Sequence, residues 1–274
     1  LSSTGVTTGL SIALDGSNNI YVVGRYNGTF TVGSSTLTTV GSDDGFIAKL
    51  DSSGNGVWAN RISGTDIDYV QGVAVDSANN PVITGYTRSS SLSIAGQTFT
   101  KVSAQDLFVA KYNSSGSSVW AIQGTTPADQ NQGTDITTDA SNNVYVAGFH
   151  TGTLTLGSVT KSGNGSSDAF VAKINSSGTV QWIANPGSNS TEYVNAIAVD
   201  SSGNVYAAVE FVSSFTVAGT AISSAGSTDI ALIKYDTSGT AQWVRTIAGL
   251  NGQYADMISI DSGGNIWVTG KYQN

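Results

Sequence analysis

The stretch DAFVAKINSSGTVQW (168–182) decides the fold, because the chain contains four versions of it. The others are DGFIAKLDSSGNGVW (44–58), DLFVAKYNSSGSSVW (106–120) and DIALIKYDTSGTAQW (229–243). All four end in a tryptophan, and successive tryptophans are 62, 62 and 61 residues apart: Trp58, Trp120, Trp182 and Trp243. Self-similarity at a fixed spacing of this size indicates a repeat protein, in which one small unit recurs and packs against its neighbours.

A second phrase recurs five times: IALDGSNNIYVVG (12–24), VAVDSANNPVITG (73–85), ITTDASNNVYVAG (136–148), IAVDSSGNVYAAV (197–209) and ISIDSGGNIWVTG (258–270). The aspartates of successive copies are 61, 63, 61 and 61 residues apart. Five copies of this phrase and four of the other indicate four full units and an incomplete fifth. We place the repeats at about 11–71, 72–134, 135–195 and 196–256, with a partial unit formed by 257–274 together with 1–10.

Each unit is predicted to contain four antiparallel strands, which we name A to D in chain order. Side chains alternate along segments such as IAVD (197–200) and NVYVAG (143–148), with β-branched and aromatic residues enriched, as is typical of strands. An Asp-x-x-x-Asn turn joins A to B, and an Asn-Ser-Ser-Gly turn joins C to D. Four-stranded units at fixed spacing predict an all-β fold, a β-propeller with five blade positions, four of them full.

The two phrases together resemble the bacterial β-propeller repeat family often called SBBP. The resemblance rests on Asp-x-x-x-Asn-Val-Tyr-Val-x-Gly, followed by Asp-x-Phe-Val-Ala-Lys-Tyr/Ile-Asn/Asp-x-x-Gly-x-x-x-Trp, and covers nearly the whole chain. Two copies depart from the pattern, with Pro81 before one B strand and Val209 in place of a glycine. The resemblance implies an exported protein, extracellular or on the cell surface, and it implies no single activity.

Composition argues against several classes of partner. Lys and Arg number 11 against 19 Asp and Glu, the net charge is −8, and the basic residues are scattered. A nucleic-acid-binding surface needs clustered Lys and Arg, so we expect no nucleic-acid partner. No apolar run is long enough to span a bilayer, so we expect no membrane insertion. With no cysteine and one histidine, His150, the chain lacks the usual transition-metal ligands, and we expect no metal and no cofactor.

The repeated side chains are interpreted as architecture. The tryptophans could stack on sugars, but their recurrence at one strand position favours filling the space between neighbouring units. The lysines that end strand C are expected to pair with the aspartates that begin it, five positions earlier: Asp44, Asp106, Asp168 and Asp229. Five positions put the two on opposite faces of one strand, so such a pair would have to join neighbouring units. Each Asp-x-x-x-Asn turn offers one carboxylate, which favours turn capping over calcium binding.

The units differ in their B–C and D–A connections, which share one face of a propeller. Variable loops on a rigid scaffold commonly carry function. The B–C connections are long, as at 25–42, and are expected to contain an extra hairpin. The D–A connections are expected to gather candidate ligand-binding residues on this face: Asp66, Asp68, Tyr69, Asp129, Glu192, Tyr193 and Tyr254. A tyrosine ring beside a carboxylate suits a glycan; alternatively, the tyrosines plug the ring and the carboxylates cap turns.

We therefore expect an extracellular, non-catalytic structural, assembly or adhesion module whose partners are other protein chains. Self-assembly would use the incomplete unit, whose open sheet edge could be covered by a neighbouring molecule, by the N-terminal segment 1–8 or by further sequence. The alternative is a lectin-like propeller that binds carbohydrate through the B–C and D–A face. A polysaccharide hydrolase or lyase, with Asp66 and Asp68 as a carboxylate pair, is a third alternative.

Overall fold

Strands, turns and irregular segments, with no helix, make up residues 2–127 and 130–273, which the computed structural model describes. The first unit is an antiparallel sheet in the order β2-β3-β6-β7. Its strands are β2 (Thr7–Leu14), β3 (Ile20–Tyr26), β6 (Asp44–Leu50) and β7 (Gly56–Ile62). They correspond to the predicted strands A to D, and they form where β-branched and aromatic side chains pack on both faces of a sheet.

The next three units repeat this sheet. The second contains β8 (Asp68–Val75), β9 (Pro81–Thr87), β12 (Asp106–Tyr112) and β13 (Ser118–Thr125). The third contains β14 (Asn131–Thr138), β15 (Val144–His150), β18 (Asp168–Ile174) and β19 (Val180–Ala184). The fourth contains β20 (Glu192–Val199), β21 (Val205–Phe211), β24 (Asp229–Tyr235) and β25 (Ala241–Ile247), and the fifth only β26 (Gln253–Ile260) and β27 (Ile266–Tyr272). The prediction of an all-β fold built from propeller blades is confirmed.

The extra hairpins predicted in the B–C connections are present in all four full units. They are β4 (Thr29–Val32) with β5 (Ser35–Thr38), β10 (Ser91–Ile94) with β11 (Gln97–Thr100), β16 (Thr153–Leu156) with β17 (Val159–Ser162), and β22 (Ser214–Val217) with β23 (Thr220–Ser223). Two of them pair with strand D of the preceding unit. Ser63, just after β7, bridges to Ser93 of β10, and β13 pairs with β16. These backbone hydrogen bonds connect strand D of one unit to the extra hairpin of the next, in addition to the side-chain packing between units.

Residues 1–10, which the repeat count assigns to the partial fifth unit, instead belong to the first unit where the structure describes them. In β1 (Ser2–Ser3), the two serines pair with Thr31 and Phe30 of β4. Thr7 and the residues after it form β2, which pairs with β3. β1 thus pairs with the extra hairpin of the first unit, just as the end of strand D of the second unit, β13, pairs with the extra hairpin of the third. The N-terminal segment therefore does not complete the sheet of β26 and β27.

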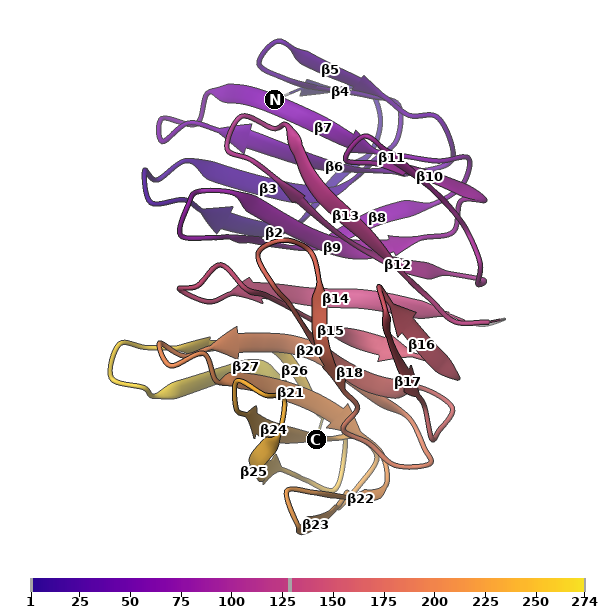
Figure 1. Cartoon of the computed structure of the whole chain (residues 1–274), viewed down its shortest axis with the longest axis vertical. Helices are drawn as coiled ribbons and strands as arrows, with labels where there is room; N and C mark the ends of the chain where they lie inside the picture. The colour runs from indigo at the N-terminus through magenta and orange to yellow at the C-terminus, as the bar shows by residue number, and fades with distance from the viewer. Residues whose placement is uncertain (1, 128–129, 274) are drawn as a thin grey trace.

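The units follow one another in chain order, with the first unit at the top of Figure 1 and the fourth and fifth together in its lower half, where β26 and β27 lie beside β20 and β21. Strand A of each unit contacts strand A of the next, so β2, β8, β14, β20 and β26 form a continuous row. β2 and β26 lie at the two ends of this row. No pairing among the described strands joins these ends into a closed ring.

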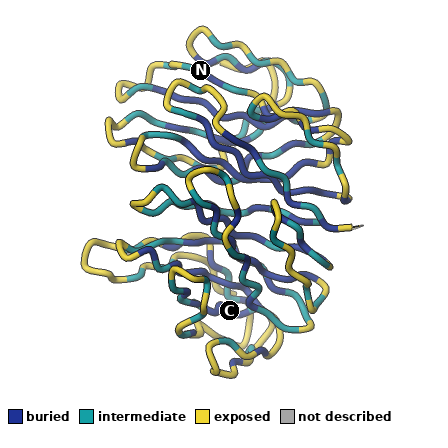
Figure 2. Tube along the Cα trace, viewed as in Figure 1, coloured by how far each residue is buried: buried dark blue, intermediate teal, exposed yellow. Residues whose placement is uncertain are grey.

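The hydrophobic core lies between the units, as the run of buried segments through the stack shows (Figure 2). The residue three positions before each turn aspartate illustrates the pattern. Val73 packs among side chains of the first unit, Ile136 among those of the second and Ile197 among those of the third. Each of the three inner units thus buries one face on its predecessor and the other on its successor, as expected for a stacked repeat.

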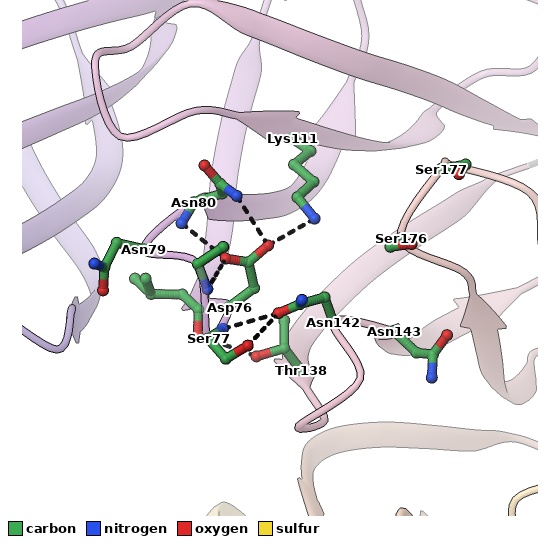
Figure 3. A network of polar contacts seen from close by, with 12 residues as sticks. Asp76, Ser77, Asn79, Asn80, Lys111, Thr138, Asn142, Asn143, Ser176 and Ser177 are labelled. Atoms are coloured by element: carbon green, nitrogen blue, oxygen red, sulfur yellow. Dashed lines mark hydrogen bonds and ion pairs between the residues drawn. The ribbon is translucent and has the colours of Figure 1, made fainter.

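The A–B turns are capped by their own aspartates, as predicted. One carboxylate oxygen of Asp76 accepts hydrogen bonds from the backbone N–H groups of Ala78 and Asn80, both at 2.9 Å (Figure 3). The turn also contacts the next unit, because Ser77 donates from its backbone and its hydroxyl to the Asn142 amide oxygen. The turn of the second unit is therefore a cap and an inter-unit contact together.

The prediction for the strand-C lysines is wrong. Lys111 pairs with the turn aspartate of its own unit, Asp76, at 2.7 Å, and both side chains are buried. Lys49 pairs in the same way with Asp15 at 3.5 Å, and Lys234 approaches Asp200 at 4.0 Å. The aspartates that begin strand C instead accept the backbone N–H of the residue four positions earlier: Asp44, Asp106, Asp168 and Asp229.

Candidate functional site

The predicted loop-face residues do not form one cluster. Asp68 begins strand β8, is fully buried, and accepts hydrogen bonds from the hydroxyls of Thr87 and Ser89. Burial raises the pKa of Asp68 to about 7, against the lowering effect of these hydrogen bonds. Glu192 begins strand β20 in the same way and accepts a hydrogen bond from the Ser188 hydroxyl at 2.5 Å. Burial also raises the pKa of Glu192. Both carboxyls lie inside joints between units, out of reach of a large ligand.

The three tyrosines lie one residue further along strand A, each at a different joint. Tyr193 packs edge-on against Phe149, with ring centroids 4.8 Å apart. Tyr69 packs against Tyr86 at 5.2 Å, and Tyr254 lies on β26 of the partial fifth unit, where it lines a groove against the fourth. The structure therefore distributes them along the stack instead of gathering them around one centre.

The remaining predicted residues are an exposed and an undescribed aspartate. Asp66 is exposed, and its backbone N–H donates to the Ser89 hydroxyl. Asp129 lies outside the described residues. Because Asp68 is buried beneath its hydroxyl partners, the two carboxylates Asp66 and Asp68 do not present a common surface to a polysaccharide in this structure.

A small pocket of about 330 Å3 opens at the first joint, lined by Leu10, Arg25, Tyr69, Gln71 and Tyr86. The Arg25 guanidinium lies 4.5 Å from the centre of the Tyr69 ring and 2.9 Å from the Asp43 carboxylate. The Tyr69 hydroxyl donates to the same carboxylate at 3.1 Å. Of the five lining residues, only Tyr69 is among the ligand-binding residues predicted from the sequence. Arg25 and Tyr86 lie on strand B, and no spacing along the chain relates them to Tyr69.

The repeated tryptophans fill the joints between units, which confirms the architectural interpretation. The Nε1–H of Trp58 donates to the backbone carbonyl of Ser114 in the C–D turn of the next unit, at 3.2 Å. Trp120 and Trp182 make the same bond to Ser176 and Thr237, at 3.1 and 3.2 Å. In all three joints, a backbone carbonyl of the C–D turn thus accepts the hydrogen bond from the tryptophan Nε1–H.

Trp243 is in the position of these tryptophans, but the fifth unit has no described C–D turn to accept its Nε1–H. A groove of about 250 Å3 lies between the fourth unit and the strands β26 and β27, and Trp243 is not among the residues that line it. We define the edge groove by Ile230, Ile247, Tyr254, Val268 and Tyr272, which line it. Strand β27 pairs only with β26 among the described strands, so its other edge faces this groove.

The first unit presents the opposite half of such a joint. At Gly54, in its C–D turn, an added Cβ would have no neighbour within 4 Å. The equivalent glycines of the next three units, Gly116, Gly178 and Gly239, are each covered by a tryptophan ring. On β2, Ile12 and Leu14 are exposed apolar side chains, and we call these two residues the first-unit face.

Two general features bear on chemistry. Among the described residues, no group of three or more His, Asp and Glu side chains is arranged to hold a metal ion. The part of the chain that the structure describes contains no helix long and apolar enough to cross a membrane.

Comparison with known proteins agrees with a propeller repeat. No protein-family model matches the sequence. An uncharacterized WD repeat-containing protein of Acanthamoeba polyphaga mimivirus is 29% identical in an alignment 213 residues long, which covers 64% of this chain and 15% of that protein. The chain therefore spans a small part of that relative's length. The similarity supports a β-propeller repeat protein and does not distinguish among the families that carry such repeats.

Solved structures show distant similarity. The WD40 domain of Neurospora crassa Pan2 matches 95% of this chain and 75% of its own, with 12% identity and a TM-score of 0.44. Hydrazine synthase of Kuenenia stuttgartiensis matches 98% and 76%, with 10% identity and a TM-score of 0.42. A protein of unknown function from Bacteroides caccae matches 90% and 84%, with 12% identity and a TM-score of 0.34. Similarities this distant transfer no activity to this chain.

Proposed function

We propose that this chain is an extracellular, non-catalytic assembly module that joins protein chains by stacking its first unit on the fifth unit of another copy. One observation carries the proposal. Ile12 of β2 is 66% exposed, whereas the equivalent residues of the later units are only 4 to 6% exposed: Val73, Ile136, Ile197 and Ile258. Those residues are covered by the preceding unit, and Ile12 has no preceding unit among the described residues.

The other end of the stack offers the complementary surface. Met257 and Trp267, which we call the fifth-unit face, are 62% and 61% exposed. Their equivalents in the fourth unit, Ala196 and Tyr206, are buried in a cluster with Ile258 of the fifth. The two ends of the stack are thus the two halves of a joint that already occurs four times within the chain.

Hydrophobic burial supports association of these ends. Burying a large apolar side chain contributes about 1.5–3 kcal/mol, and the two faces together expose four such side chains: Ile12, Leu14, Met257 and Trp267. A contact between two different surfaces of identical chains is head-to-tail, and it extends into a ring or a filament. The expected product is therefore a series of oligomers instead of a single dimer.

Light scattering after size exclusion, over a range of loading concentrations, tests this function. The mass should rise above the 28.0 kDa of one chain as concentration increases. Ile12→Asp should keep the chain monomeric, because it places a charge in the joint. Val119→Asp changes a valine that is 51% exposed on strand β13, away from both faces, and should leave association intact. A mass of 28 kDa at every concentration would refute self-assembly.

The proposal places the protein outside the cell or on its surface, among the bacterial SBBP-type repeat proteins. Its support is the resemblance of the two repeated phrases to those exported proteins. Protease treatment of intact cells should remove a surface-exposed chain before it affects cytosolic markers. Full protection of the chain in intact cells, with cleavage after lysis, would contradict the location.

Carbohydrate binding is a second candidate function, favoured by the pocket at the first joint. Tyr69 and Tyr86 provide aromatic surface there, and Arg25 and Gln71 provide hydrogen-bond donors. Glycan-array binding should be lost with Tyr69→Ala and kept with Tyr193→Ala, since no arginine lies over Tyr193. Equal binding by both variants would rule out this pocket. Hydrolase or lyase activity stays a prediction, which turnover on a polysaccharide panel would test.

A further inference from the structure

We infer that the pocket at the first joint binds an acidic sugar, whose carboxylate is held by the guanidinium of Arg25 and whose ring lies against Tyr69 and Tyr86. This inference rests on carbohydrate binding, the second candidate function, and it names the class of sugar. It does not depend on stacking between chains. Strand β3 contacts β8, so the pocket lies at a joint between two full, consecutive units.

Two β-bulges shape the pocket. The pairing register shifts around Leu10 in β2 and around Gln71 in β8, and both of these residues line the pocket. A bulge re-aims a side chain and is common beside functional sites. The pocket volume of about 330 Å3 is near the lower end of the range for small-ligand sites, about 300–1,000 Å3. The expected ligand is therefore a small part of a glycan, such as one sugar residue.

Arg25 offers a held guanidinium with free donors. Its Nη1 donates to the Asp43 carboxylate at 2.9 Å and to the Tyr69 hydroxyl, and the side chain is 35% exposed. Among the described residues, its Nε and Nη2 have no acceptor. The planar edge of a guanidinium matches the two oxygens of a carboxylate. Because Arg25 is already oriented by Asp43 and Tyr69, binding would cost it little further freedom.

The charges around the two tyrosines favour an anion. The Tyr69 and Tyr86 rings pack together, and each has a guanidinium nearby. Arg25 lies 4.5 Å from the centre of the Tyr69 ring, and the exposed Arg88 lies 5.8 Å from the centre of the Tyr86 ring. Asp43 is already bonded to Arg25 and to the Tyr69 hydroxyl. Arg88 uses its Nε to bond Gln105, which leaves its Nη1 and Nη2 for a ligand.

This combination of residues does not recur in the other full units. The residues equivalent to Arg25 are Tyr86, Phe149 and Glu210, and those equivalent to Arg88 are Asn27, Thr151 and Val212. The joint between the third and fourth units keeps an aromatic pair, Phe149 and Tyr193, with ring centroids 4.8 Å apart. It has no arginine at either equivalent position. Preference for an acidic sugar is therefore expected at the first joint alone.

Calorimetric titration of the intact 274-residue chain, at a concentration where light scattering gives a single mass, tests the site. The probes are trimers of galacturonate, glucuronate and mannuronate, each compared with its neutral methyl ester. At least one acid should bind about tenfold more tightly than its ester, because only the acid forms charge-assisted hydrogen bonds with Arg25. Added salt should weaken binding of the acid and leave binding of the ester unchanged.

Variants of two arginines locate the effect. Arg25→Gln should abolish the preference for the acid, and it should cost little stability because the ion pair with Asp43 is partly exposed. Arg25→Lys keeps the charge but loses the planar edge, so it should keep only part of the preference. Arg245→Gln is the matched control. Arg245 also lies over an aromatic ring, 5.6 Å from the centre of Trp243, but it is on β25, outside the pocket.

The outcomes separate this inference from the candidate function. Equal affinity for acid and ester, or an unchanged preference in Arg25→Gln, would overturn the acidic-sugar site and leave carbohydrate binding standing. Displacement of the sugar by an equal concentration of acetate would also overturn it, because the carboxylate alone would then be the ligand. No binding of any glycan would refute both. Preference for the acid by a chain that stays monomeric would support the site and refute end-face stacking.

Discussion

The indole ring of Trp58 covers Gly116 of the following unit so closely that a Cβ added to this glycine would lie 2.9 Å from the ring. Gly116 also has a φ of +83°, a backbone conformation that other residues adopt only with strain. Two residues that are far apart in the chain, Trp58 and Gly116, therefore form one contact. The turn needs glycine for its positive φ, and in the second, third and fourth units the tryptophan of the preceding unit also packs on it.

Alanine substitution separates the two reasons for this glycine. Gly54 has the same φ of +83° but no neighbour within 4 Å of an added Cβ. Gly54→Ala should cost only the backbone strain, about 1–2 kcal/mol. Gly116→Ala should cost about 1–3 kcal/mol more, because its Cβ overlaps the Trp58 ring. Thermal unfolding followed by circular dichroism would show the larger fall in Tm for Gly116→Ala, and equal falls would contradict the packing argument.

Removing a buried lysine should be more harmful than removing an exposed one. Lys111 and Asp76 form a pair whose side chains are 5% and 1% exposed. Lys111→Met leaves the buried Asp76 carboxylate unpaired and should destabilise the fold by about 3–5 kcal/mol. Lys234→Met removes a longer, more exposed contact to Asp200 and should cost about 1 kcal/mol or less. Urea unfolding of the two variants at pH 7 measures the difference, and similar losses would argue against it.

The same pair predicts how acid affects the protein. Burial alone would raise the pKa of Asp76, but hydrogen bonds from Lys111 and Asn80 outweigh it, so the folded-state pKa is lowered from 3.8. A carboxyl with a lowered folded pKa stabilises the fold above its unfolded pKa, and this stability is lost as pH falls through the folded value. The wild-type advantage over Asp76→Asn should therefore shrink in unfolding experiments below about pH 4. A constant advantage down to pH 2 would contradict this.

Asp68 predicts the opposite pH dependence. Its folded pKa is about 7, above the ordinary 3.8, so folding favours the protonated carboxyl. This contribution is fully present below the unfolded pKa and is lost as pH rises to about 7. Asp68→Asn, which copies the neutral Asn131 at the equivalent position of the third unit, should raise Tm more at pH 8 than at pH 5. An equal change in Tm at the two pH values would refute the assignment.

Mixing two association-defective variants tests the head-to-tail geometry. Ile12→Asp blocks the first-unit face and Met257→Asp blocks the fifth-unit face, so each variant alone should be monomeric. An equimolar mixture retains one intact pair of faces, and light scattering should show a heterodimer that does not grow with concentration. Larger oligomers from the mixture, or no complex at all, would exclude stacking of these two faces.

Much of the architecture follows from local pattern. The recurrence of Trp58 and its three equivalents predicts the units and the joints between them, because a residue repeated at one strand position faces the same side of every unit. The strands and the capped turns follow from alternation and from aspartate chemistry, which act over a few residues. The extra hairpins followed in the same way from the length and composition of the B–C connections.

The partners of individual side chains do not follow from such patterns. The alternation rule correctly put Lys111 and Asp106 on opposite faces of one strand, but the true partner, Asp76, comes from the A–B turn of the same sheet. Asp68 and Glu192 were assigned to loops, and they are buried because strand A begins earlier than its alternating segment indicates.

The sequence by itself determined the repeat, the strands and the residues of the joints, because these depend on short-range periodicity. Only the tertiary structure decided how deeply equivalent residues of different joints are buried. Ile62 and Ile247 are the same residue at the same repeat position, and one is buried while the other is exposed. The difference lies in what packs against them, which is a property of the whole stack and of no single unit. The edge groove and the two end faces exist for that reason.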